Sequence, residues 1–234
     1  LSLPATLEYI GDRAFYNCTG FNGFYNFQSS AVKFIGDSAF YDLYQMNGDL
    51  IFPDTLLNVG DSAFYNNFSV DGRIIFGDQT SGIGAYSFYN VRNAYGSLVI
   101  PNSVSGVGSF AFFDCTGLDG NLTLGNQMLV IKESTFENCN NLFGDLIIPD
   151  SVLDIENNAF KNCFGFIADL TITDIAANSL NGRNSFDQSD FSRLIISDFV
   201  TNISDVEFDY FQNREFDVVF QENLSGIGDF SFDN

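Results

Sequence analysis

Residues that could carry out chemistry are few in this chain of 234 residues. It contains four cysteines, 30 acidic residues and no histidine. Histidine is the commonest general base and transition-metal ligand, so its absence removes the usual routes to proton transfer and metal binding. Carboxylates are abundant, but an open surface does not desolvate one member of a pair and so separate their pKa values. We therefore expect no catalytic residues and no cofactor.

The cysteines share one position in a repeated unit, three residues after a recurring phenylalanine; they are Cys18, Cys115, Cys139 and Cys163. Equivalent residues on neighbouring strands lie about 4.8 Å apart with parallel Cβ directions. A disulfide instead needs Cβ atoms about 3.8 Å apart that face each other. The sequence also contains no Cys-x-x-Cys pair for zinc. We predict buried free thiols and no metal site.

The charge of the chain restricts its partners. Its formal net charge is −21, which argues against nucleic acid and anionic membrane surfaces as partners. No apolar run approaches the roughly 18 residues of a membrane span. Asp12, Asp37 and Asp61 recur at one repeat position, and Ca²⁺ could relieve their repulsion. Solvation and local capping of the backbone explain these carboxylates more simply.

A unit of about 24 residues repeats through the whole chain. Its anchor is a phenylalanine, and the steps between successive anchors run from 22 to 26 residues: Phe15, Phe40, Phe64, Phe88, Phe112, Phe136, Phe160, Phe186, Phe208 and Phe232. Ten copies of one short unit predict a solenoid of about ten coils, built as one continuous domain over residues 1–234.

A second set of positions keeps a step of 24 residues throughout: Leu50, Ile74, Leu98, Leu122, Leu146, Leu170, Leu194 and Val218. Another apolar residue stands two positions after each of them. This alternation predicts one short strand per unit with one face in the core. The later Ala-Phe segment of each unit is a turn, a short extended piece or a 3₁₀ stretch.

The segment Gly144–Val152, followed by Ile155, Ala159, Phe160 and Cys163, resembles the BspA-type (Treponema pallidum-type) leucine-rich repeat. The resemblance covers the whole chain. It implies a β-rich, right-handed solenoid with a parallel concave sheet and little α-helix. It also implies an extracellular or cell-surface setting and a role in adhesion, and it supplies no catalytic residues.

The chain begins and ends inside the repeat pattern. Solenoid ends normally carry atypical capping units. We therefore expect the chain to be a segment of a longer array.

Between the two buried positions of each strand lies a residue that should point outward: Ile51, Ile75, Val99, Thr123, Ile147, Thr171, Ile195 and Val219. All eight are β-branched, which suits any pleated surface. An apolar column of this length would equally suit a face covered by a partner protein, another copy or a flanking domain. A polar column borders it: Asp49, Arg73, Ser97, Asn121, Asp145, Asp169, Arg193 and Asp217.

A second candidate surface consists of the aromatic residues that come directly after the first five anchor phenylalanines in the sequence: Tyr16, Tyr41, Tyr65, Tyr89 and Phe113. Tyrosines with exposed edges suit sugars or protein partners. The simpler interpretation is that identical rings stack on one another because the units repeat.

These features favour a non-enzymatic extracellular or cell-surface recognition and adhesion module. It would bind a protein or glycan through the concave sheet. The alternative is a structural subunit that assembles with its own copies into an extracellular fibre, sheath or layer.

Overall fold

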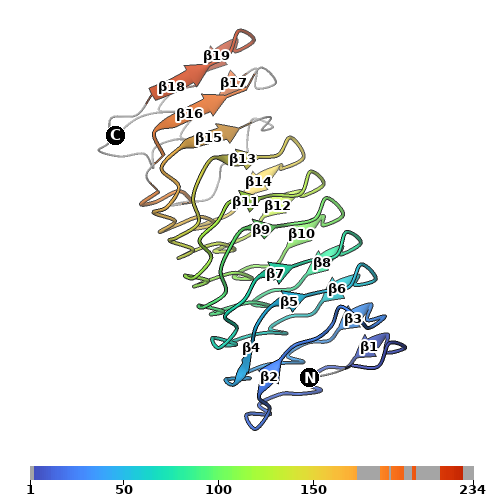
Figure 1. Ribbon diagram of the computed structural model, residues 1–234. Helices are drawn as coiled ribbons and strands as arrows, with labels where there is room; N and C mark the ends of the chain where they lie inside the picture. The colour runs from blue at the N-terminus through green and yellow to red at the C-terminus, as the bar shows by residue number, and fades with distance from the viewer. Residues whose placement is uncertain (1–2, 173–184, 190, 198–201, 204–216, 229–234) are drawn as a thin grey trace.

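The chain winds into a solenoid whose turns stack one beside the next (Figure 1). The computed structural model describes residues 3–172, 185–189, 191–197, 202–203 and 217–228. These ranges contain strands and turns without a helix, so they include no helix able to cross a membrane. The anchors Phe208 and Phe232 lie outside the described residues. The predicted class, a parallel-strand repeat solenoid, is confirmed.

One ladder of strands forms a continuous sheet, which we call the long sheet. It contains β1 (Tyr9–Ile10), β3 (Phe34–Ile35), β6 (Asn58–Val59), β8 (Gly82–Ile83), β10 (Gly106–Val107), β12 (Val130–Ile131) and β14 (Asp154–Ile155). All of its pairs are parallel. In each strand the second residue is buried and the first is exposed or partly exposed, so the long sheet closes one side of the core.

The strands predicted from the 24-residue spacing form a second ladder, which we call the interrupted ladder. It contains β5 (Leu50–Ile51), β7 (Ile74–Ile75), β9 (Leu98–Val99), β11 (Leu122–Thr123), β13 (Leu146–Ile148), β15 (Asp169–Ile172), β16 (Arg193–Ile196) and β18 (Asp217–Phe220). Partners within it are 24 residues apart, as the spacing predicts. Two small pairs complete the described strands: β2 (Gly23–Phe24) with β4 (Met46–Asn47), and β17 (Asn202–Ile203) with β19 (Gly226–Ile227).

The solenoid has about eight turns, so the expectation of about ten coils is slightly high. The anchors overcount because an anchor does not guarantee a ladder strand. Tyr25 and Phe27 are buried in alternation, as Leu50 and Phe52 are, yet residues 25–27 form no strand.

The anchor phenylalanines form a continuous stack through the core. From Phe15 to Phe186, successive rings lie 5.0 to 5.7 Å apart and within 11° of parallel. These separations suit offset-stacked rings. The stack therefore ties each turn to the next from Phe15 to Phe186.

The Ala-Phe segment, whose form the sequence left open, is a turn. Each turn places two non-glycine residues in the left-handed region, as at Ser62 and Asn66, whose φ angles are 54° and 57°. Asparagine and aspartate tolerate this conformation better than other non-glycine residues. They occupy the second position in seven successive units: Asn17, Asp42, Asn66, Asn90, Asp114, Asn138 and Asn162.

The side chains at this second position form an amide ladder. Four asparagines donate through Nδ2 to the Oδ1 one coil earlier, as in the bonds from Asn90 to Asn66 at 2.8 Å and from Asn138 to Asp114 at 2.7 Å. The ladder is interrupted between Asn17 and Asp42 and between Asn90 and Asp114, because a carboxylate has no proton to donate. The buried Oδ1 of Asn90 consequently has no hydrogen-bond partner in the described structure.

Two kinds of coil alternate along the interrupted ladder. Gly48, Gly96 and Gly144 have φ angles of 77°, 84° and 88°, and the strands of their coils are followed by Pro53, Pro101 and Pro149. The coils between them carry Gly77 and Gly125 in place of proline. A Cβ at these glycines would lie 2.4 Å from Pro53 O and 2.3 Å from Pro101 O, so each glycine coil packs directly against the preceding proline coil.

Strand pairing follows this alternation. β5 pairs with β7 and β9 with β11, but the ladder stops between β7 and β9 and again between β11 and β13. Leu98 and Ile100 each donate a backbone hydrogen bond of 2.9 Å to the next coil. In the described structure Leu122 and Leu124 make no such bond to Asp145 and Ile147. The coils from β5 to β11 therefore form pairs, separated by seams.

The broken amide ladder predicts that Asp114→Asn stabilises the protein. The new amide would donate to Asn90 and still accept from Asn138, while the lost ion pair with Arg92 is exposed and contributes little. We expect the free energy of unfolding to rise by about 1 kcal/mol, measured by urea denaturation. Asp78→Asn removes the same charge at an exposed site and should leave stability unchanged; an equal gain there would attribute the effect to charge alone.

Close packing of paired coils predicts that Gly125→Ala destabilises the protein. The added methyl group would overlap Pro101 O and force the coils apart, at a cost of about 1–3 kcal/mol. Gly106→Ala is the matched control, because a Cβ at Gly106 meets no atom within 4 Å. Thermal unfolding of both variants checks this, and equal melting temperatures would contradict it.

Candidate binding face

The middle residues of the interrupted ladder point away from the core, as predicted. Ile75, Val99, Thr123 and Ile147 are exposed, and Ile51, Thr171, Ile195 and Val219 are partly exposed. Val99 and Ile147 expose 52% and 54% of their surface, whereas the flanking Leu98 and Ile100 are buried. Strand alternation thus creates an apolar column on the outer face of the ladder.

The polar column beside it contains two ion pairs between neighbouring coils. Arg73 bonds to Asp49 through its backbone N at 2.7 Å and its Nη2 at 3.3 Å. Arg193 binds Asp169 with Nε at 2.9 Å and Nη2 at 2.5 Å. The backbone hydrogen bond from Arg73 is the main cause that lowers the pKa of Asp49, and the side-chain hydrogen bond from Arg193 lowers the pKa of Asp169.

The remaining described members of the polar column form no ion pair within 4 Å, although Arg193 attracts Asp145 and Asp217 at longer range. Ser97 Oγ accepts the backbone N–H of Asn121 at 3.1 Å, and Asp145 Oδ1 accepts that of Asp169 at 3.1 Å. Asp217 is exposed at the start of β18. Carboxylates with an arginine partner, Asp49 and Asp169, therefore alternate along the column with Asp145 and Asp217, which form no ion pair in the described structure.

The recurring Asp12, Asp37 and Asp61 cap the backbone. Their Oδ1 atoms accept the N–H groups of Asp37, Asp61 and Ala85 in the next coil at 2.7–2.9 Å. This supports the capping interpretation over calcium binding. Within the part of the chain that the structure describes, no group of three or more His, Cys, Asp or Glu side chains could hold a metal ion.

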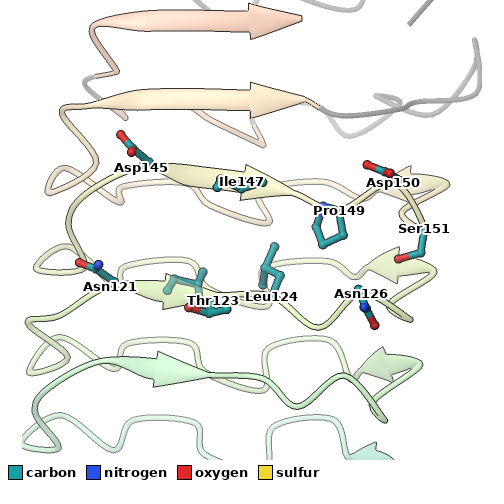
Figure 2. Close-up of a pocket in the computed structure, with 10 residues that line it drawn as sticks. Asn121, Thr123, Leu124, Asn126, Asp145, Ile147, Pro149, Asp150 and Ser151 are labelled. Atoms are coloured by element: carbon teal, nitrogen blue, oxygen red, sulfur yellow. The ribbon is translucent and has the colours of Figure 1, made fainter. Parts of the chain in front are cut away.

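A groove of about 650 Å³ lies at the seam between β11 and β13 (Figure 2). Asn121 and Asp145 stand at one end, and Asn126, Asp150 and Ser151 at the other; Thr123, Leu124, Ile147 and Pro149 lie between them. The structure thus brings the predicted Thr123, Asp145 and Ile147 into one hollow. Sequence reasoning missed this groove, although the change from Gly125 to Pro149 marks the seam.

The second candidate surface is a stack of rings. From Tyr16 to Phe113, successive centroids are 4.7–4.9 Å apart and the rings lie within 18° of parallel. Burial is the main cause that raises the pKa of Tyr41, Tyr65 and Tyr89. Inner rings cover each other's faces and leave mainly edges exposed, so the structure supports the stacking interpretation.

A short parallel stack lies beside this aromatic surface. Tyr86 and Phe110 stack at 4.9 Å, and they lie 5.9 Å from Tyr89 and 5.8 Å from Phe113 respectively. Sequence reasoning missed this pair because both residues occupy the left-handed turn position, where aromatic residues are unusual.

The cysteines are free thiols. Cys115, Cys139 and Cys163 are buried and donate S–H hydrogen bonds of 3.1–3.2 Å to Phe88, Phe112 and Phe136 O, whereas Cys18 is partly exposed. Burial raises the pKa of the Cys139 and Cys163 thiols. Both remain protonated at neutral pH, and they pack as small apolar residues.

Comparisons with a family model and with solved structures agree on the fold. A family model described as BspA type leucine rich repeat region matches in six copies over residues 1–93, 33–167, 81–205 and 179–234. No curated protein matches the chain. A leucine-rich repeat protein from Bacteroides ovatus superposes with a TM-score of 0.62 and 18% identity, covering 99% of this chain and 63% of that protein.

A second similar structure is a leucine-rich repeat protein of T. pallidum. It has a TM-score of 0.56 and 24% identity, and the match covers 70% of this chain and 76% of that protein. At these identities the likeness concerns the fold. The chain also spans under two thirds of the length of the Bacteroides ovatus protein.

The different burial of the thiols predicts unequal reactivity. Because the thiolate is the reactive form, one thiol of the four, Cys18, should react with iodoacetamide at pH 8 in the native state. The other three should react at least about 100-fold more slowly until urea unfolds the chain. Mass spectrometry of timed samples checks this. Fast native labelling of Cys139 would contradict its buried position.

Proposed function

Because this chain belongs to the BspA-type leucine-rich repeat family, we propose that it is a non-enzymatic recognition module. It binds a partner protein through the outer face of the interrupted ladder. The observation that carries this proposal is the exposed apolar column, centred on Val99 and Ile147 and bordered by polar side chains. An apolar centre with a polar rim is the usual build of a protein interface.

A protein fits this face better than a glycan does. The outward residues of the column are aliphatic or threonine, and they offer no aromatic ring on which a sugar could stack. The aromatic surface has rings, but their faces are taken up by one another. We therefore assign recognition to the interrupted ladder and a packing role to the aromatic stack.

The family resemblance supports a place at the cell surface or outside the cell. There the module would adhere to host or matrix proteins. The net charge of −21 disfavours close packing of identical copies at low salt, so recognition ranks above self-assembly into a fibre or layer. Self-assembly is nevertheless favoured by the same exposed column, and it is an outcome of the test below.

The proposal predicts that charges placed on the column weaken binding. Ile75→Asp combined with Val99→Asp should weaken binding to an extracellular-matrix protein at least about tenfold, because two contacts at an interface centre each contribute about 1 kcal/mol or more. Surface plasmon resonance against purified fibronectin, laminin and fibrinogen measures this. Both residues lie on β7 and β9, outside the groove.

The matched control is Leu129→Asp combined with Leu153→Asp. These leucines are 49% and 53% exposed and sit on neighbouring coils beside the long sheet. An equal loss of binding affinity in both double variants would show that the interrupted ladder is not the binding face. The proposal would also fail if the unmodified chain bound none of these matrix proteins. Self-assembly would be favoured instead if light scattering detected multimers of the unmodified chain in high salt but none of the Ile75/Val99 variant.

A further inference from the structure

We propose that the groove between β11 and β13 binds an extended partner segment that carries two arginines four positions apart, with an apolar residue midway between them. This inference rests on the proposed function, because it names the chemistry of the partner that the interrupted ladder recognises. One arginine pairs with Asp145 and the other with Asp150, while the apolar part of the segment lies over Ile147 (Figure 2).

The chain itself shows how the polar column binds a guanidinium group. At Asp49 and Asp169, the carboxylate pairs with an arginine of the next coil, Arg73 or Arg193, at 2.5–3.3 Å. Such charge-assisted bonds from a planar guanidinium group are strong and directional. This column position is thus built to hold an arginine side chain against a carboxylate.

Asp145 forms no such close ion pair, and the guanidinium group of Arg193 attracts it only at longer range. Its neighbours in the column are Asn121 on β11's side and Asp169 on the other, and the guanidinium group of Arg193 is engaged by Asp169. Asp145 Oδ1 accepts the backbone N–H of Asp169, as Asp49 Oδ1 accepts that of Arg73. Its Oδ2, the atom that binds arginine in Asp49, has no hydrogen-bond or ion-pair partner in the described chain.

The far end of the groove offers a second carboxylate. Asp150 is exposed and forms no ion pair with any described residue. Asn126 and Ser151 stand beside it. No basic side chain lines the groove, so both carboxylates would attract a cation from a partner.

The middle of the groove suits an aliphatic chain. Ile147 is more than half exposed there, and Leu124 and Pro149 also line it. Arginine side chains lay their methylene stems on apolar surface while the charged group stays in water. The groove therefore complements both parts of an arginine side chain, and it leaves room for an apolar residue between two of them.

The spacing of the two carboxylates fits an extended segment. Asp145 and Asp150 are five residues apart across β13, about 16 Å at the rise of a strand. In an extended peptide, residues 1, 3 and 5 point to the same side, and residues 1 and 5 are about 13 Å apart. Arginines at positions 1 and 5 can span the difference with their long side chains, and residue 3 then faces Ile147.

The other seam, between β7 and β9, lacks this chemistry. Between β7 and β9, Arg73 replaces Asn121 and Ser97 replaces Asp145. At the far end Asp78 and Asn102 stand in place of Asn126 and Asp150. The four side chains at the seam between β7 and β9 carry a net charge of zero, whereas the four at the groove carry −2. The two-carboxylate arrangement therefore lies at the seam between β11 and β13.

The test uses a fluorescein-labelled peptide, Arg-Thr-Val-Thr-Arg, and fluorescence anisotropy with the full chain. Asp145→Asn combined with Asp150→Asn should weaken peptide binding at least about tenfold, since each charged contact contributes about 1 kcal/mol or more. Replacing both arginines of the peptide by glutamine should have the same effect. The control, Asp54→Asn combined with Asp78→Asn, makes the same change in net charge at two exposed sites outside the groove.

Equal weakening in the groove and control variants would overturn the inference, because it would show attraction by the overall charge alone. Absence of peptide binding to the unmodified chain would also overturn it. These failures are distinguishable from failure of the proposed function, which is read from matrix-protein binding by the Ile75/Val99 variant. If matrix proteins still bind through that column, and neither the peptide nor substitution of Asp145 affects this binding, the proposed recognition function stands. Only the proposal about the groove then fails.

Discussion

The fold depends on one constraint, which is that each coil must stack on the next at the spacing of hydrogen-bonded strands. At that spacing every side chain lies on its own equivalent in the next coil. The constraint favours side chains that interact favourably with an identical side chain in the next coil. Rings therefore stack in the core and at the surface at 4.7–5.7 Å, and asparagine amides bond in a ladder from coil to coil. A carboxylate column is the difficult case, because equal charges then meet at short range.

The protein resolves that difficulty with its own backbone. At several columns a carboxylate accepts an N–H group of a neighbouring coil, as Asp61 does from Ala85 of the next coil at 2.7 Å and Asp119 from Gly96 of the preceding coil at 2.7 Å. These N–H groups would otherwise need water or another acceptor. Many of the carboxylates that give the chain its net charge of −21 thus accept hydrogen bonds that join neighbouring coils. The carboxylates available to a partner are the ones left over, such as Asp150 and one oxygen of Asp145.

Periodicity explains why the sequence predicts so much of this fold. The 24-residue step of Leu50, Ile74 and their successors sets the strand register directly, because a solenoid places equivalent residues side by side. The outward position of Val99 and Ile147 follows from strand alternation. Features that depend on differences between repeat units cannot be predicted from the period alone. The pairing of coils depends on whether Gly77 or Pro53 follows a strand, and the missing strand at residues 25–27 depends on hydrogen bonds that the alternation of Tyr25 and Phe27 does not reveal.

Those same differences decide where a specific site can exist. In a uniform solenoid every coil offers the same contacts, so a partner could slide from one coil to the next with little change in energy. A unique position requires a break in the repeat. The seam between β11 and β13 combines three breaks, in strand pairing, in the change from Gly125 to Pro149 and in the change from Asn121 to Asp145. The regular coils supply an apolar column, and the irregular seam supplies the charge and the hollow that would fix the register of the proposed partner on it.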